Sequence, residues 1–160
     1  MSAVIYLQAI TPILPIPAPK DPIGRAFGWR ELVARADSAA RAATLETHTA
    51  TWLGGDRYQE AAELALWSPA HPTTFATNLS GRRNQYDLWP NFSDVARPGD
   101  NLLLVLDDSD EPPGSVNALS PFFGETRRGD RLLLQRGGAT IGTRRLWLLV
   151  GWHSGWPAPR

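Results

Sequence analysis

From residue 28 to residue 43 the chain has the periodicity of a helix with one buried face. Apolar side chains recur every three or four positions, as expected of such a face; they are Trp29, Leu32, Val33, Ala36, Ala39, Ala40 and Ala43. We place the charged side chains of the segment on the opposite, polar face, namely Arg30, Glu31, Arg35, Asp37 and Arg41. The pattern therefore predicts a first long amphipathic helix.

A strand, a second helix and a second strand are expected next. Residues 49–53 form a short β-prone run that ends at Gly54-Gly55, and Asp56 is placed to cap the following helix, which Pro69 ends. Residues 73–77 read as the second strand. The buried stripe that we predict for this second helix consists of Tyr58, Ala61, Ala62, Ala65 and Leu66.

The second half of the chain is richer in strands. Residues 102–106 are continuously apolar, which is typical of a strand that is covered on both faces. Residues 110–119 begin as a turn and then allow a short helix. The tail offers three strand candidates, at 122–127, 131–136 and 145–151.

A strand, a helix, a strand and a loop-rich crossover to a further strand favour a parallel core. We predict a three-layer α/β domain with a mixed, mostly parallel sheet flanked by helices and an antiparallel C-terminal meander. Residues 21–160 form this single domain, and residues 1–20 form an apolar, proline-rich lead-in.

Composition excludes several classes of function. With 16 basic and 16 acidic side chains the formal charge is zero, so the chain lacks the basic surplus of a nucleic-acid-binding protein. There is no cysteine, which excludes disulfides, thiolate metal sites and cysteine nucleophiles. His48, His71 and His153 lack the spacing of metal ligands. We predict no catalytic residue, metal ion or cofactor in this chain.

Residues 81–89 form the most informative segment. They lie in an unusually long connection between two strand candidates and hold two guanidinium groups, two amides, a carboxylate and two aromatic rings. Such side chains suit a polyhydroxyl or anionic ligand, because guanidinium groups bind phosphate, amides bind hydroxyls and aromatic faces stack on sugar rings. The alternative is an ordered loop whose polar side chains bond only within their own domain.

Ligands of parallel sheets bind beyond the carboxyl ends of the strands, where residues 54–57, 81–89 and 107–111 emerge. If these segments converge, arginines could hold an anion while tyrosine and tryptophan rings form a wall for a sugar. We interpret the acidic residues 107–111 as a solvated turn in preference to a cation site. The candidate binding residues are Arg57, Tyr58, Arg82, Arg83, Asn84, Gln85, Tyr86, Asp87 and Trp89.

The N-terminal residues 4–17 are apolar but fall short of the roughly 20 residues that span a bilayer. They are either a buried first strand or the end of a transmembrane helix that begins upstream. Near the other end, Trp152 and Trp156 are either exposed at a membrane surface or packed against this N-terminal run.

Several short motifs occur in the order of a known family: Asp21-Pro22, Gly28-Trp29, Arg57-Tyr58-Gln59, His71-Pro72 and Asn84-Gln85-Tyr86-Asp87-Leu88-Trp89. In this respect the chain resembles the C-terminal soluble region of bacterial protein-mannosyltransferase-like membrane glycosyltransferases. These enzymes are relatives of the lipid A aminoarabinose transferases and use lipid-linked sugar donors. The resemblance covers about residues 12–89, and its last motif is the most specific.

The resemblance implies an accessory domain on the periplasmic side of the inner membrane. The catalytic aspartate of the family lies near the start of the full enzyme, outside this chain, so this domain alone should not transfer sugar. Its implied partners are the transmembrane part of the same enzyme, a polyprenyl-phosphate sugar or glycan acceptor, and the nearby membrane surface. It also favours the transmembrane interpretation of residues 4–17. The alternative function is a non-catalytic protein-interaction or structural module without a ligand pocket.

Overall fold

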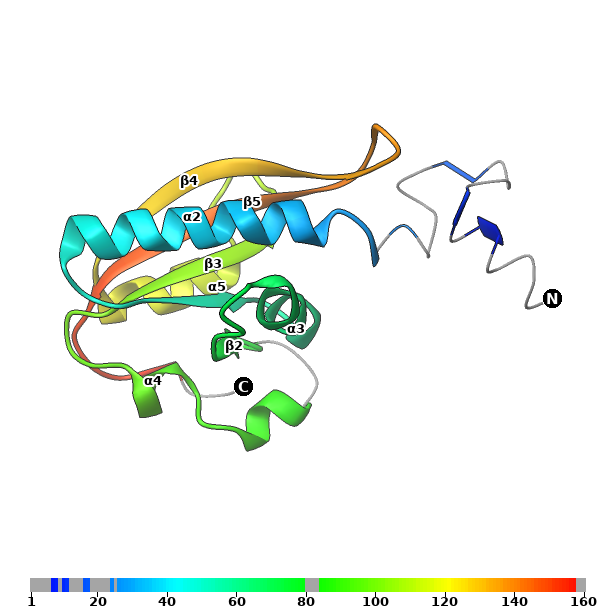
Figure 1. Ribbon diagram of the computed structural model, residues 1–160. Helices are drawn as coiled ribbons and strands as arrows, with labels where there is room; N and C mark the ends of the chain where they lie inside the picture. Colours follow the sequence, from blue (N-terminus) through cyan, green and yellow to red (C-terminus); the bar gives the residue numbers. More distant parts are fainter. Residues whose placement is uncertain are drawn as a thin grey trace.

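The computed structural model describes residues 7–8, 10–11, 16–17, 24, 26–79 and 84–157. One five-stranded sheet runs in the order β2-β1-β3-β5-β4 (Figure 1). Its strands are β1 (Thr51–Gly55), β2 (Thr74–Ala76), β3 (Asn101–Asp107), β4 (Phe123–Arg136) and β5 (Ala139–Trp152). The helices are α2 (Trp29–Thr47), α3 (Tyr58–Trp67), α4 (Phe92–Val95) and α5 (Gly114–Leu119), with the 3-10 turns η3 (Gln85–Leu88) and η4 (Ser120–Phe122).

The mixed α/β class is confirmed, but the prediction of a mostly parallel sheet is wrong. β1 runs parallel to both β2 and β3, whereas β5 is antiparallel to both β3 and β4. The parallel pairs involve strands of 3, 5 and 7 residues, while β4 and β5 have 14 residues each. Most of the strand pairing is therefore antiparallel.

The tail is a long hairpin and not a meander of three short strands. Two predicted strands, 122–127 and 131–136, fall in one strand, β4, except for Phe122, which ends η4. A register shift between Arg128 and Arg131 absorbs the irregularity at Gly129-Asp130. Such a bulge lets the strand continue with a local change of twist. The second strand of the hairpin, β5, then inserts between β3 and β4.

Both faces of β3 are covered, as its apolar run predicts. Leu103 and Val105 join a cluster with α2 and α3, and Leu102, Leu104 and Leu106 join a second cluster with α4 and α5. In Figure 1, α2 crosses the near face and α5 lies behind the sheet. The helices of the second face have only 4 and 6 residues, so this face lacks the full helical layer of the predicted three-layer arrangement.

Helix α2 begins near the expected position and buries the predicted apolar stripe except Ala39, which is half-buried. Asp37, however, is not on its polar face. This side chain is buried with Val33, Ala36 and Ala40. Asp37 follows Val33 by four residues and precedes Ala40 by three, which is the spacing of one helix face. The helix geometry thus determines where the residue lies, despite its charge.

The N-cap of helix α3 lies one residue later than predicted, at Arg57 and not at Asp56. Arg57 occupies the N-cap position, and its backbone N–H donates to the Glu60 carboxylate (3.1 Å). The Asp56 carboxylate instead accepts a hydrogen bond from the Thr77 hydroxyl (2.9 Å). The buried stripe is also shifted: it contains Glu60, Ala61 and Leu64, while the predicted members Tyr58, Ala62 and Leu66 are exposed.

The C-terminal tryptophans pack onto the second cluster. Trp152 is buried, and the rings of Trp152 and Trp156 lie 5.7 and 5.5 Å from the ring of Phe92. Most of the N-terminal lead-in, residues 1–20, lies outside the described residues. Within the described part of the chain, no helix is both long enough and apolar enough to cross a membrane.

Candidate functional site

The candidate site begins where the parallel strands β1 and β2 end. Thr77 N–H donates to Gly55 O (2.9 Å) and Asn78 N–H donates to Asp56 O (3.1 Å), so the pairing continues past both strands. A side-chain bond from Thr77 to Asp56 adds to this connection. These bonds hold residues 77 and 78 against the end of β1, and the Asn78 side chain reaches the segment after residue 83.

The polar side chains of that segment hold its own turn together. Asn84 Oδ1 accepts from Tyr86 N–H (2.8 Å), and Asp87 Oδ2 accepts from Asn84 N–H (2.6 Å). The amide of Asn78 donates to both carboxylate oxygens of Asp87 (3.0 and 3.2 Å). For Asn84 and Asp87 the structure therefore matches the alternative interpretation, an internally bonded loop that is fastened to its own domain.

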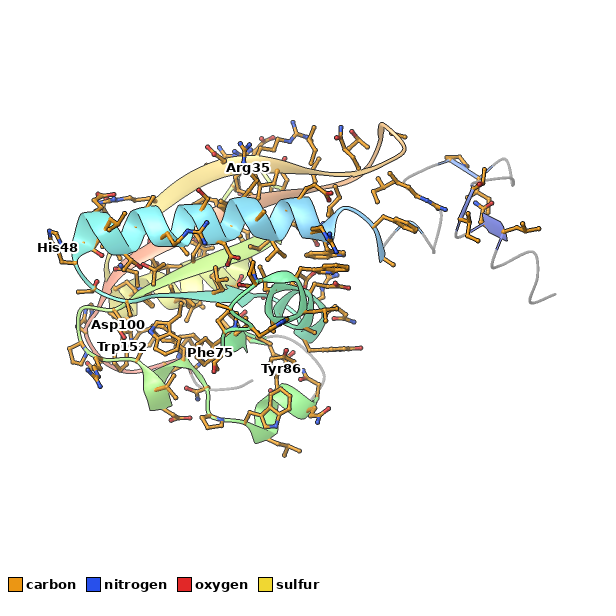
Figure 2. All side chains as sticks on the ribbon, viewed as in Figure 1. Arg35, His48, Phe75, Tyr86, Asp100 and Trp152 are labelled. Carbon is orange, nitrogen blue, oxygen red and sulfur yellow. The ribbon has the colours of Figure 1, made fainter. Side chains whose placement is uncertain are left out.

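The aromatic side chains of the same segment face a hollow. The rings of Tyr86 and Trp89 meet edge to face, with centroids 4.9 Å apart. Both line a groove of about 410 Å³ along the outer side of β2, which we call the aromatic groove. Figure 2 shows Tyr86 on the segment beyond β2, with Phe75 nearer the sheet. The other residues that line the aromatic groove are Ala65, Pro72, Thr73, Thr74, Phe75, Ala76, Pro90, Asn91 and Val95.

The other predicted site residues that the structure describes do not line this groove. The Arg57 guanidinium pairs with Asp107 (3.1 Å), which brings residues 54–57 and the end of β3 together. Tyr58 is exposed on α3, and Gln85 is exposed at the start of η3. Arg82 and Arg83 lie outside the described residues. The structure therefore joins residues 54–57 directly to the end of β3 and, through Asn78, to Asp87. The candidate side chains that the structure describes do not surround one cavity.

A charged cluster that we did not predict lies beside Arg57. Arg144, on β5, pairs with Asp107 (2.8 Å), approaches the Glu60 carboxylate (3.8 Å) and stacks over the Trp29 ring (5.6 Å). Burial raises the pKa of Glu60 above its ordinary value, although its backbone hydrogen bond and Arg144 act in the opposite direction. With Arg57, the cluster holds two carboxylates and two guanidinium groups, so its formal charges balance.

The acidic residues after β3 are not simply a solvated turn. Asp108 is largely enclosed, and its carboxylate pairs with Arg131 (2.6 Å) and Arg145 (2.8 Å). These bonds fasten the end of β3 to both strands of the hairpin. Across the described ranges, no three His, Asp or Glu side chains form a group that could hold a metal ion.

A second hollow lies at the other end of β1, and we did not predict it. This pocket of about 480 Å³ is bounded by the C-terminal half of α2, the start of β1 and the loop after α3. Asp37 and Ser68 belong to its wall, and the Ser68 hydroxyl donates to Asp37 Oδ1 (3.1 Å). We call it the Asp37 pocket. Pro72 and Thr73 line both this pocket and the aromatic groove.

The sequence did contain a sign that Asp37 is buried: its spacing from Val33 and Ala40 places it on the buried face of the helix. A carboxylate on a buried face requires a partner or a ligand. The pocket itself could not be predicted from the sequence, since its walls come from three separate segments of the chain.

Comparisons of the chain with protein-family models, with curated proteins and with solved structures gave no match.

Proposed function

We propose that this chain is the accessory, extracytoplasmic domain of an inner-membrane glycosyltransferase that uses a lipid-linked sugar donor. In this proposal the aromatic groove receives a sugar unit of the donor headgroup or of the glycan acceptor. The observation that carries it is that Tyr86 and Trp89, two residues of the most specific family-like motif, both line the groove. The partners are the transmembrane part of the same enzyme and the adjoining membrane surface.

The chemistry of the groove supports a sugar ligand. The carbon-bound face of a sugar ring packs on aromatic side chains, and Trp89 leaves about half of its surface, 51%, open for such contact. A volume of about 410 Å³ lies within the usual range for small-molecule sites. Stacking contacts of this kind need no charged partner, which agrees with a groove whose lining residues are all uncharged.

The edge of β2 can supply the hydrogen bonds that sugar hydroxyls need. Thr77 N–H bonds to β1, and backbone groups alternate in direction along a strand. The N–H and C=O groups of Thr74 and Ala76 therefore point away from β1, towards the groove that these residues line. A strand edge of this kind offers donors and acceptors beside the aromatic rings.

We assign the domain to recognition and not to sugar transfer. The carboxylates nearest the strand ends, Glu60, Asp107 and Asp108, are engaged with arginines and do not line the groove. A general acid or base must reach the reacting atoms, and these groups are held elsewhere. The chemical step then belongs to the membrane part of the enzyme.

A protein-interaction module is the second candidate, and a specific surface favours it. Leu88 is 84% exposed beside Trp89, and Val95 is partly exposed on the same segment. Neighbouring exposed apolar side chains are typical of a contact with another protein surface. In this case the segment would hold the membrane part of the enzyme, and the groove would carry no ligand.

The test is a heteronuclear NMR titration of the whole chain with methyl mannoside, methyl arabinoside and farnesyl phosphate. We expect saturable shifts at residues 74–76 and at Tyr86 and Trp89 with at least one sugar. Tyr86→Ala and Trp89→Ala should each weaken binding about tenfold, because each removes one stacking face.

Two matched variants serve as controls for this titration. Tyr58→Ala removes an exposed aromatic ring outside the groove, and Leu88→Ala removes an exposed apolar neighbour of Trp89. Both should bind as the wild type does. If no sugar shifts the groove at millimolar concentration, the sugar site is wrong and the interaction module takes its place.

A further inference from the structure

The Asp37 pocket contains a buried carboxylate without a cationic partner. Asp37 is 8% exposed and Ser68 is 2% exposed, and the hydroxyl of Ser68 supplies the single hydrogen bond to the Asp37 carboxylate that the described residues show. Within those same residues no arginine or lysine forms an ion pair with it. A carboxylate that leaves water without such compensation costs several kcal/mol unless another group binds it.

The second oxygen of this carboxylate is not sealed from solvent. Among described side chains that are not themselves exposed, the atoms sealed from solvent without a partner are Ser115 Oγ, Arg144 Nε and Trp147 Nε1. Asp37 Oδ2 is not one of these atoms, and Asp37 belongs to the pocket wall. A ligand in the pocket can therefore reach this oxygen.

The start of β1 adds a second acceptor. β2 begins at Thr74, opposite Leu53, so it does not extend to Thr51. Ala50 O accepts from Asn101 N–H on the β3 side, and Gly55 O accepts from Thr77 N–H on the β2 side. Because these directions alternate along a strand, the C=O of Thr51 points to the side where β2 is missing. Thr51 lines the pocket there.

The other walls of the pocket are mainly apolar, with Ala40, Leu45, Leu53, Pro69, Ala70 and Pro72 among them. Arg41 also lines the pocket, one helical turn after Asp37, but it is exposed and forms no ion pair with Asp37 within the described residues. The pocket thus combines a buried carboxylate and a backbone carbonyl with a surface that suits aliphatic groups. A neutral hydroxyl could donate to Asp37 but would leave its charge uncompensated. An ammonium group supplies both the donors and the opposite charge.

We propose that the Asp37 pocket binds a compact organic cation, a primary ammonium group on a short aliphatic body. The ammonium group donates to Asp37 Oδ2 and to the carbonyl of Thr51, and the aliphatic body packs on Leu45 and the prolines of the loop after α3. This site shares Pro72 and Thr73 with the aromatic groove but none of its other lining residues, and the proposal does not depend on the function proposed for that groove.

The experiment is an NMR titration of the whole chain with n-butylammonium chloride. We expect saturable shifts at Asp37, Thr51 and Ser68, with little change at Tyr86 and Trp89. Two further probes define the chemistry: n-butanol keeps the aliphatic body without the charge, and tetramethylammonium keeps the charge without N–H donors. Both should bind at least about tenfold more weakly than n-butylammonium, since each lacks one part of the interaction.

Variants then assign the binding to the carboxylate. Asp37→Asn keeps the side-chain shape and removes the charge, and it should abolish saturable binding. Asp56→Asn is the matched control, because Asp56 also accepts from a hydroxyl, that of Thr77, but lies outside the pocket. It should leave the affinity unchanged.

A surface variant keeps the proposal testable if Asp37→Asn fails to fold. Arg41 is exposed and lines the same pocket, so Arg41→Glu should fold normally. It replaces a repelling charge with an attracting one and should strengthen n-butylammonium binding severalfold. Equal binding of n-butanol, an unchanged affinity in either Asp37→Asn or Arg41→Glu, or the absence of saturable shifts would each overturn the proposal.

Discussion

The two edge strands of the sheet differ in length and in charge. β4 forms one edge with 14 residues, and its exposed positions carry charged side chains, including Glu125, Arg128 and Arg131. β2 forms the other edge with three residues, Thr74, Phe75 and Ala76, and none of them is charged. Charged side chains along an exposed strand prevent it from pairing with another chain.

This difference between the edge strands coincides with the position of the two hollows. At the β4 edge, arginines tie the hairpin to its neighbours: Arg127 pairs with Glu46 of α2, and Arg131 pairs with Asp108 at the end of β3. At the β2 edge, the short strand leaves a groove along its outer side and a pocket beside the start of β1, which pairs with β3 but not with β2. Both candidate ligand sites therefore lie at the edge that lacks protecting charges.

The largest effect is expected from Phe92→Ala, which removes the anchor of the segment that walls the β2 edge. Phe92 is fully buried, and its ring lies within 5.5 to 5.7 Å of the rings of Phe75, Phe123, Trp152 and Trp156. Losing it should reduce the free energy of unfolding by about 3–5 kcal/mol, measured by urea denaturation. Phe92→Leu should cost clearly less. A loss below about 1 kcal/mol for the alanine variant would show that this ring is not the anchor.

Gly55→Ala and Gly124→Ala compare the two sides of the sheet directly. A Cβ at Gly55 would lie 2.4 Å from the Cβ of Glu60, so β1 and α3 must separate. A Cβ at Gly124 in β4 meets no atom closer than 3.6 Å. We expect Gly55→Ala to lower stability by about 1–3 kcal/mol, as overpacking does, and Gly124→Ala to change it by less than about 0.5 kcal/mol. Similar thermal midpoints for the two variants would contradict this contrast.

The pH dependence of Glu60→Gln is a smaller effect at the same contact. Burial raises the pKa of Glu60 above its ordinary value of 4.5. A raised pKa means that the folded state holds the proton more tightly. The resulting stabilisation is present below pH 4.5 and is lost as the pH rises through the raised pKa. Glutamine does not titrate, so the stability of Glu60→Gln relative to wild type should increase across this interval. If the curves of unfolding free energy against pH were parallel for Glu60→Gln and the wild type, this prediction would be wrong.

The smallest effect is expected from Arg127→Ala at the β4 edge. Its ion pairs with Glu46 and Glu125 are exposed to solvent, so stability should remain within error of the wild type. The local electrostatics should still change. Arg127 holds the pKa of Glu125 below its ordinary value through a direct hydrogen bond. In the variant, the NMR titration of the Glu125 carboxyl should move to higher pH. An unchanged titration would show that this pair does not persist in solution.

The elements with a strong local pattern could be predicted from the sequence. The apolar run 102–106 became β3, and the spacing of Trp29, Leu32, Val33 and Ala36 gave α2 its buried face. The hairpin could not be predicted in the same way. Whether Gly129-Asp130 ends a strand or forms a bulge depends on β5, which supplies the partner across the irregularity. Pairing between distant segments is not a local property of the chain.

The candidate sites show the same limit. Tyr86 and Trp89 could be identified as binding candidates because their motif combines aromatic rings with amides, and both line the groove. Arg57 could not be separated from them, since only the fold shows that its guanidinium is bound to Asp107. The Asp37 pocket joins residues from α2, β1 and the loop after α3, so its walls meet only after folding.

The wall that Pro72 and Thr73 share between the two hollows has a thermodynamic consequence. If an occupant of one hollow displaces this short segment, the shape of the other hollow changes as well. Linkage then requires reciprocity: the factor by which a cation in the Asp37 pocket alters the affinity for a sugar equals the factor by which the sugar alters the affinity for the cation. Two residues of loop backbone would make one edge of the sheet a coupled pair of sites.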